Sequence, residues 1–172
     1  QITEAHLVAR RDGLTPPTME QPQYNLFERQ KIEADYAPIY DTYGLGTTIW
    51  SPLASGILTG KYNAAIPNDS RINLPGYEWL RDMVMSDEGQ AKLAKTRALA
   101  DVAQAAGLSL AHMCLLWCLA NPRVSTVILG ASRASQLTDN LAALQHKAKL
   151  TPDVMAAIEA VMANKPAGPQ RF

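Results

Sequence analysis

The chain has 172 residues, of which 47% are apolar and 19% charged, enough for one domain with a substantial core. Sixteen basic and sixteen acidic residues cancel, which argues against nucleic acids and anionic membranes as partners. No apolar run approaches the roughly 20 residues of a membrane-spanning helix, and no basic-then-apolar leader opens the chain. We therefore expect a soluble cytoplasmic protein.

The first part of the chain predicts two helices and two strands. A helix with apolar residues on one face opens the chain and ends at Gly13, and residues 18–21 form a weak strand. Residues 25–44 form a second helix, for which Asn25 is a plausible N-cap. The next strand ends at Trp50, and the connection over residues 51–75 is long enough to be functional or mobile.

The second part predicts four helices and the clearest strand. Residues 86–106 and 109–120 form successive helices that end before Gly107 and at Asn121-Pro122. Residues 124–129 form an apolar, β-branched strand. Ser135 begins a helix that carries three leucines, and Thr151-Pro152 begins a last helix that ends near Ala163. Residues 73–87 either overhang a site as a lid or pack on a helix.

Strands and helices alternate without hairpin signals between the strands, an order typical of a parallel sheet with right-handed helical crossovers. We expect a single domain over residues 1–172, with a loosely ordered tail over residues 165–172. The two cysteines, Cys114 and Cys118, lie one helical turn apart in an apolar stretch. Buried thiols are the simplest interpretation and suit a reducing cytosol, with a disulfide or a metal site as the alternatives.

Two strands end in loops of serine, glycine and proline. Residues 47–56 read TTIWSPLASG, and residues 129–132 read LGAS. Side by side, such loops offer backbone N–H groups and hydroxyls to a phosphorylated ligand. Trp50 adds a flat surface for an aromatic ring, unless it only packs in the core.

Other motifs are weak. The segment from Gly56 to Lys61 resembles a P-loop but has one residue too few between its glycines and lacks the magnesium-binding Ser or Thr. His6, His112 and His146 are isolated at distant positions without partners at metal-binding spacing, so we expect no metal site.

The motifs taken together resemble the carboxyl-terminal half of an aldo-keto reductase, most closely the branch that includes the β-subunits of voltage-gated potassium channels and their bacterial relatives. The resemblance covers nearly the whole chain in the right order. The matching segments are residues 20–21, 24–27, 50–56, 60–62, 70–71, 117–119, 129–132, 136–137 and 140.

The resemblance implies an α/β fold: half of a (β/α)8 TIM barrel, with three parallel strands and flanking helices. It also implies NADPH as the cofactor, with Trp50 stacked on the nicotinamide and Gln21 bonded to its carboxamide. The implied pyrophosphate set comprises Ser51, Leu53, Ser55, Lys61 and Arg71, and the adenosine set comprises Ser132, Gln136 and Asn140. Pro52 and Gly130 complete the two loops. In barrels generally, the phosphate site lies in the loops after the last two strands.

Arg133 is our candidate for the 2′-phosphate that separates NADPH from NADH, because a guanidinium suits a phosphate dianion bidentately. A solvated surface arginine is the alternative. Related channel subunits often have an aromatic residue just before the Ser70-Arg71 pair, whereas this chain has Asp69. That acid could weaken the phosphate clamp or pair with Arg71.

The family reduces carbonyls with a tyrosine proton donor tuned by Lys, Asp and usually His or Asn, and none of these has a matching position here. The catalytic residues are therefore unknown, with Tyr24 and Lys61 as the remaining guesses. Three hypotheses stay open: an NADPH-dependent reductase of a small carbonyl substrate, an NADPH-binding partner module without efficient turnover, and an inactive fragment. Because a three-stranded sheet leaves two edges open, we expect a homo-oligomer that covers them.

Overall fold

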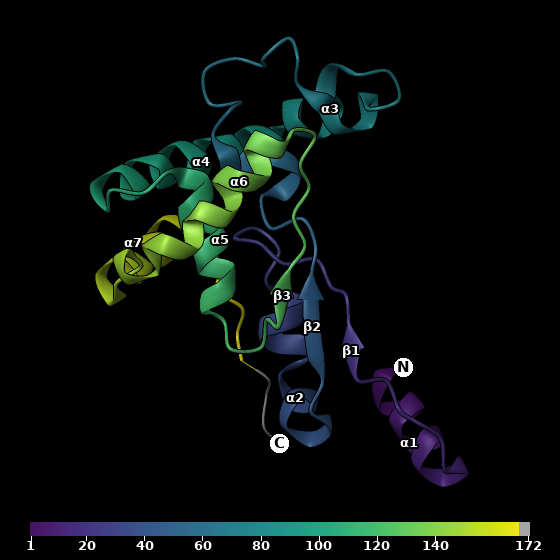
Figure 1. Ribbon diagram of the computed structural model, residues 1–172. Coiled ribbons are helices and arrows are strands. Elements are labelled where there is room, and N and C mark those ends of the chain that lie inside the picture. The colour runs from purple at the N-terminus through teal and green to yellow at the C-terminus, as the bar shows by residue number, and fades with distance from the viewer. Residues whose placement is uncertain (169–172) are drawn as a thin grey trace.

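Three short parallel strands form the sheet in the computed structural model, which describes residues 1–168. Central β2 (Gly46–Ile49) pairs with β1 (Met19–Glu20) on one side and with β3 (Thr126–Val127) on the other. Among the described residues, each outer strand keeps one edge without a neighbouring strand (Figure 1). The predicted parallel, half-barrel architecture is confirmed. The loose tail was predicted partly on residues 169–172, which lie outside the described residues.

Helices occupy most of the remaining chain. In chain order they are α1 (Ile2–Asp12), α2 (Ala37–Tyr43), α3 (Glu78–Met85), α4 (Asp87–Ala105), α5 (Leu110–Ala120), α6 (Ala134–Ala142) and α7 (Pro152–Met162). A π-helical turn spans Lys31–Asp35, and 3₁₀ segments span Ala54–Thr59, Arg71–Asn73 and Ala143–Lys149. α4, α5, α6 and α7 gather on one side of the sheet, α3 lies beyond the carboxyl ends of the strands, and α1 lies apart beyond β1 (Figure 1).

Side-chain caps fix the starts of three helices where the sequence predicted them. The hydroxyls of Ser86, Ser109 and Thr151 accept the N–H groups of Gly89, His112 and Val154 at 3.1, 3.2 and 3.3 Å. Each bond satisfies a donor that the first turn of a helix leaves unpaired. The predicted boundaries of α4, α5 and α7 are thereby confirmed to within a residue or two.

The predicted helix over residues 25–44 is wrong in its first half. Asn25 caps a tight turn, in which its Oδ1 accepts the N–H groups of Phe27 and Glu28 at 2.9 and 3.0 Å. The π-helical turn follows, and α2 begins only at Ala37. Pro38 occupies the start of α2. Inside a helix a proline lacks the N–H for the backbone bond and clashes with the preceding turn, but the first turn tolerates it.

The strand predicted over residues 124–129 is extended and parallel to β2, but only Thr126 and Val127 form β3. Ser125 and Ile128 donate backbone hydrogen bonds to Thr47 and Ile49 at 2.9 and 2.8 Å, on either side of β3. Parallel pairing extends only as far as the neighbouring strand, and β2 ends at Ile49. α6 likewise begins one residue before its predicted start at Ser135.

α5 forms the centre of the main core. Eight of its residues are buried, from Leu110 to Cys118, because α4, α6, β3 and the 3₁₀ segments Ala54–Thr59 and Ala143–Lys149 surround it. Trp117 stacks on Tyr24 with ring centroids 5.0 Å apart. Both cysteines lie here as free thiols, and burial raises the pKa of each.

A second, smaller core holds the long connection after β2. Ile57, Tyr62 and Ile72 from that connection pack with Leu80 and Val84 of α3 and with Leu93 of α4. Residues 51–75 are therefore anchored on helices. The same contacts decide the two alternatives for residues 73–87 in favour of packing, since α3 lies against α4.

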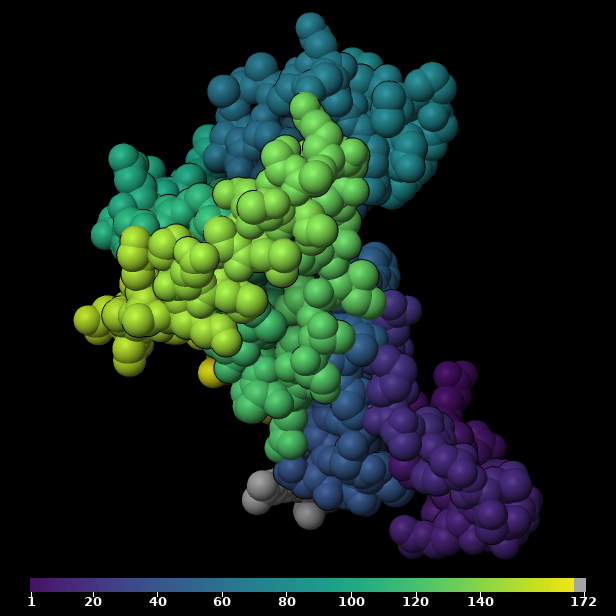
Figure 2. All heavy atoms as spheres, viewed as in Figure 1, coloured from purple at the N-terminus to yellow at the C-terminus, as the bar shows by residue number. Residues whose placement is uncertain are grey.

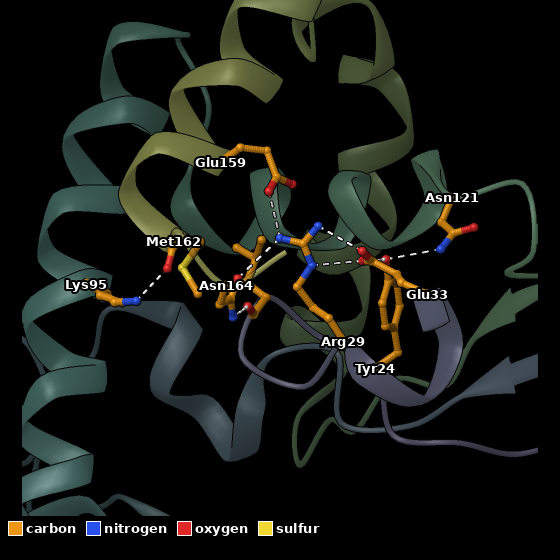
Figure 3. A network of polar contacts seen from close by, with 9 residues as sticks. Tyr24, Arg29, Glu33, Lys95, Asn121, Glu159, Met162 and Asn164 are labelled. Atoms are coloured by element: carbon orange, nitrogen blue, oxygen red, sulfur yellow. Dashed lines mark hydrogen bonds and ion pairs between the residues drawn. The ribbon is translucent and has the colours of Figure 1, made fainter. Parts of the chain in front are cut away.

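A buried arginine ties α7 to the segment before α2 (Figure 3). The Arg29 guanidinium donates to Glu33 through Nε and Nη2, both at 2.9 Å, and to Glu159 through Nη1 at 2.8 Å. Asn164 accepts from the same Nη1 at 3.2 Å and donates to the Leu26 carbonyl at 2.8 Å. The end of α7 is thus fixed beneath the turn that follows Asn25.

None of the helices within residues 1–168 is by itself long and apolar enough to cross a membrane; α4 and α5 reach that hydropathy only as a pair bent by 89°.

Candidate functional site

Trp50 and Gln21 lie at the carboxyl ends of adjacent strands. The Trp50 N–H donates to the Pro22 carbonyl at 3.1 Å, and its carbonyl accepts from the Tyr24 N–H at 3.3 Å. Gln21 follows β1 directly, and the two side chains line one shallow hollow together with Lys31. The Trp50 side chain is 44% exposed, so core packing does not explain it. The sheet thereby offers a flat aromatic face beside an amide.

The chain after Trp50 folds into a left-handed turn. Ser51, Ala54 and Ser55 have φ values of 54°, 48° and 56°. Residues other than glycine adopt such positive values only with backbone strain. The Asn25 amide donates to the Ser51 carbonyl at 2.9 Å, and the Ser51 hydroxyl accepts the Ser55 N–H at 3.2 Å. These bonds hold the turn. Pro52 is buried, and Ser51, Leu53, Ala54 and Ser55 are each partly exposed.

The Lys61 ammonium lies next to this turn. Gly56 has a φ of 96°, and a Cβ placed there would come 3.0 Å from Lys61 Nζ and 3.6 Å from the Tyr62 hydroxyl. Burial and the nearby Arg71 lower the pKa of Lys61. Lack of a side chain at Gly56 therefore lets a lysine ammonium lie against the turn, with a second positive charge close by.

Two buried hydroxyls of the same connection lack hydrogen-bond partners. Tyr62 and Ser70 are 3% and 6% exposed, and within the described structure neither hydroxyl is bonded. A buried polar group without a partner costs about 1–3 kcal/mol, which points to a ligand or water. A lysine ammonium and unbonded hydroxyls near a partly exposed left-handed turn suit an oxyanion such as a pyrophosphate.

The loop after β3 forms the other side of the site. Gly130 and Ser132 are exposed, and Gln136 of α6 folds back to accept the Ser132 N–H at 2.8 Å and its hydroxyl at 3.1 Å. The Gln136 oxygen also accepts the Arg133 N–H at 3.3 Å. Asn140 lies one turn further along α6 and is half-buried. The Gln136 side chain thus accepts hydrogen bonds from the backbone N–H groups of Ser132 and Arg133, just before α6.

Asp69 joins the two loops. Its carboxylate lies 3.5 Å from the Arg133 guanidinium, and both side chains are exposed. Our expectation that Asp69 could pair with Arg71 is therefore wrong for this structure, because Arg133 is the partner at ion-pair distance. Figure 2 shows the same meeting of segments: light-green atoms at the start of α6 reach the blue-teal atoms of the connection after β2.

The structure removes one of the two guesses for a proton donor. Tyr24 is 2% exposed, and its hydroxyl donates to Glu33 at 2.7 Å and accepts from Asn121 at 3.1 Å. Burial, and then the Glu33 carboxylate, raise the pKa of Tyr24. Its hydroxyl is committed to the core beneath the turn.

The histidines are less isolated than their spacing suggested. The rings of His112 and His146 stack with centroids 5.7 Å apart, and His112 Nε2 bonds to the Asp139 carbonyl at 2.8 Å. Among residues 1–168, no group of three or more His, Cys, Asp or Glu side chains has a metal-binding arrangement.

Sequence reasoning missed how the site is supported. Asn25 was read as a helix cap, yet its amide holds the Ser51 carbonyl 26 positions away. Arg29 and Glu33 are four residues apart in the sequence, the spacing of an ion pair on a helix. That spacing could have indicated the Arg29–Glu33 part of the buried network. No local pattern indicates Glu159 as the third member.

The site therefore defines a class of protein before any comparison: a parallel α/β half barrel that presents an aromatic face and a cationic anion cradle at its strand ends. The chain belongs to the aldo/keto reductase family, which it matches over residues 1–163.

Among curated relatives, the chain is 48% identical over 167 residues to a probable voltage-gated potassium channel subunit beta of Oryza sativa subsp. japonica. It is 45% identical over 173 aligned positions to a protein of the same description from Arabidopsis thaliana. The alignments cover 96% and 100% of this chain but 50% and 52% of the relatives, so the chain spans about half their length. The resemblance stated from its motifs is confirmed.

Proposed function

We propose that this chain is the NADPH-binding half of an oxidoreductase that acts on a small carbonyl substrate. The observation that carries the proposal is the Lys61 ammonium at the left-handed turn beside the buried Tyr62 hydroxyl, which has no hydrogen-bond partner within the described residues. A second such hydroxyl, Ser70, directly precedes Arg71 in the chain. Positive charge and unused hydroxyls match a pyrophosphate better than they match an uncharged ligand.

The remaining residues fit the other parts of the same cofactor. Trp50 and Gln21 would hold the nicotinamide and its carboxamide, since they share one hollow at the strand ends. Ser51 and Ser55 would line the pyrophosphate, whereas Ser132, Gln136 and Asn140 would hold the adenosine. Arg133 would meet the 2′-phosphate. When bound, the cofactor supplies a hydride to a carbonyl carbon.

Proton donation is the part of the reaction for which the chain offers least. The Tyr24 hydroxyl is buried and bonded, and the ammonium of Lys61 lies at the anion cradle. This favours a second candidate, an NADPH-binding regulatory or partner module without efficient turnover. Oxidation of NADPH in the presence of a small aldehyde separates the two functions, because only a reductase consumes the cofactor.

Association with a second copy of the chain is part of the proposal. The free edges of β1 and β3 can pair with further strands. Leu137, Leu141 and Leu144 are each about half exposed along α6 and the 3₁₀ segment after it, so burial of that stripe would stabilise an assembly. We place the protein in the cytosol, where the buried thiols would stay reduced.

The direct test is quenching of tryptophan fluorescence by NADPH. Trp50→Ala should remove most of the quenching and weaken binding about tenfold, the scale of one aromatic stacking contact. Trp79→Ala is the matched control, because Trp79 is 56% exposed on α3 and outside the proposed site. The cofactor site would be refuted if NADPH did not bind at concentrations well above the micromolar range. Equal losses of quenching and affinity in the two variants would also refute it.

A further inference from the structure

The ion pair between Asp69 and Arg133 links the two loops of the site. Asp69 belongs to the connection after β2, and Arg133 is the N-cap residue of α6. Their side chains are 74% and 66% exposed and 3.5 Å apart, so the pair lies at the rim of the site rather than in its core. The Asp69 carboxylate therefore pairs with the same Arg133 guanidinium that the proposed function assigns to the 2′-phosphate.

Asp69 also acts on the anion cradle. Its charge raises the pKa of Lys61, opposing burial and Arg71, which lower it. The direct contact of the carboxylate is with Arg133, on the adenosine side. An acid in this position repels a bound anion and offers Arg133 an alternative partner.

We propose that Asp69 is a specificity-determining residue, which competes with the 2′-phosphate for Arg133 and so reduces the preference for NADPH over NADH. This rests on the proposed function. NADH has a free 2′-hydroxyl in place of the phosphate, and it can bind with the ion pair intact. NADPH must displace the carboxylate to reach Arg133, and its phosphate dianion then lies near an acid.

The ion pair also gives the preference a dependence on salt. Exposed ion pairs contribute little to stability and are screened by salt. Competition from Asp69 therefore weakens as ionic strength rises, and so does the attraction between Arg133 and the phosphate. Measurements at low ionic strength show the effect at its largest.

The test compares the dissociation constants of NADPH and NADH for the wild-type chain and for Asp69→Asn. The variant should bind NADPH about two- to fivefold more tightly and NADH with little change, the factor that corresponds to one exposed ion pair. Asp41→Asn is the matched control, because Asp41 forms an exposed pair with Arg123 at 2.7 Å, and neither residue belongs to the proposed site. It should change neither constant.

A double variant tests whether the effect of Asp69 acts through Arg133. In Arg133→Met, the further substitution Asp69→Asn should no longer change the ratio of the two dissociation constants, because the shared partner is gone. Equal tightening of both cofactors, or a gain that persists without Arg133, would overturn the inference and indicate a general effect of charge on the pyrophosphate. Failure of the wild-type chain to bind either cofactor would instead overturn the proposed function, and with it this inference.

Discussion

Replacement of Arg29 by methionine should strongly destabilise the chain. Arg29 is 4% exposed and makes four polar contacts, with Glu33, Glu159 and Asn164, at 2.8 to 3.2 Å. Its guanidinium also lies 5.1 Å from the centre of the Trp117 ring. Methionine keeps most of the apolar stem but leaves two carboxylates facing each other.

The magnitude follows from the burial of those carboxylates. Removal of one partner from a fully buried ion pair costs about 3–5 kcal/mol. The side chains of Glu33 and Glu159 are 16% and 30% exposed, so water recovers part of that loss. We expect the free energy of unfolding to fall by about 2–4 kcal/mol.

Urea unfolding, followed by tryptophan fluorescence and by circular dichroism, measures this loss. The matched control is Arg123→Met, which removes the exposed pair with Asp41 and should cost about 1 kcal/mol or less. A cost below about 1 kcal/mol for Arg29→Met, or equal costs for the two variants, would refute the assignment of a buried hub.

Two further outcomes test the site itself. Asn25→Ala should lower the free energy of unfolding by about 2 kcal/mol in urea titrations, because it leaves the Ser51 carbonyl and two N–H groups without buried partners; a neutral effect would show that the turn holds without Asn25. Burial lowers the pKa of Lys61 below the ordinary 10.5, so its ammonium loses the proton at a lower pH than a free lysine. NADPH affinity, measured as a function of pH, should therefore fall as pH rises through that pKa, whereas Lys61→Arg should keep its affinity; parallel curves would argue against the role of this charge.

Local signals in the sequence were enough for several helix starts and for the sheet type, but not for α3 or for the first half of the helix predicted over residues 25–44. A serine or threonine that caps the next turn fixes a helix start by itself, and Ser109 and Thr151 do so at their predicted places. The alternation of strands with long helical crossovers, without hairpin signals, favoured parallel pairing. These features depend on neighbours within a few residues, which the sequence displays directly.

Features that join distant segments could not be predicted in the same way. The alternation pattern shows that residues 124–129 can extend, yet the ladder length depends on where β2 ends. The partner of Asp69 was sought beside it, at Arg71, whereas the fold brings Arg133 to it from 64 positions away. Proximity along the chain also suggested Tyr24 for chemistry, and burial against Trp117 excludes it.

The turn after β2 shows where stability and function diverge in this chain. Ser51, Ala54 and Ser55 hold a backbone conformation that glycine adopts freely and that costs other residues about 1–2 kcal/mol each. Glycine at Ala54 would relieve that strain, but it would also let the turn sample other shapes in the folded state. Selection for heat resistance alone would therefore tend to rewrite this segment, and a thermostabilised variant of the chain is the place to look for a loosened ligand site.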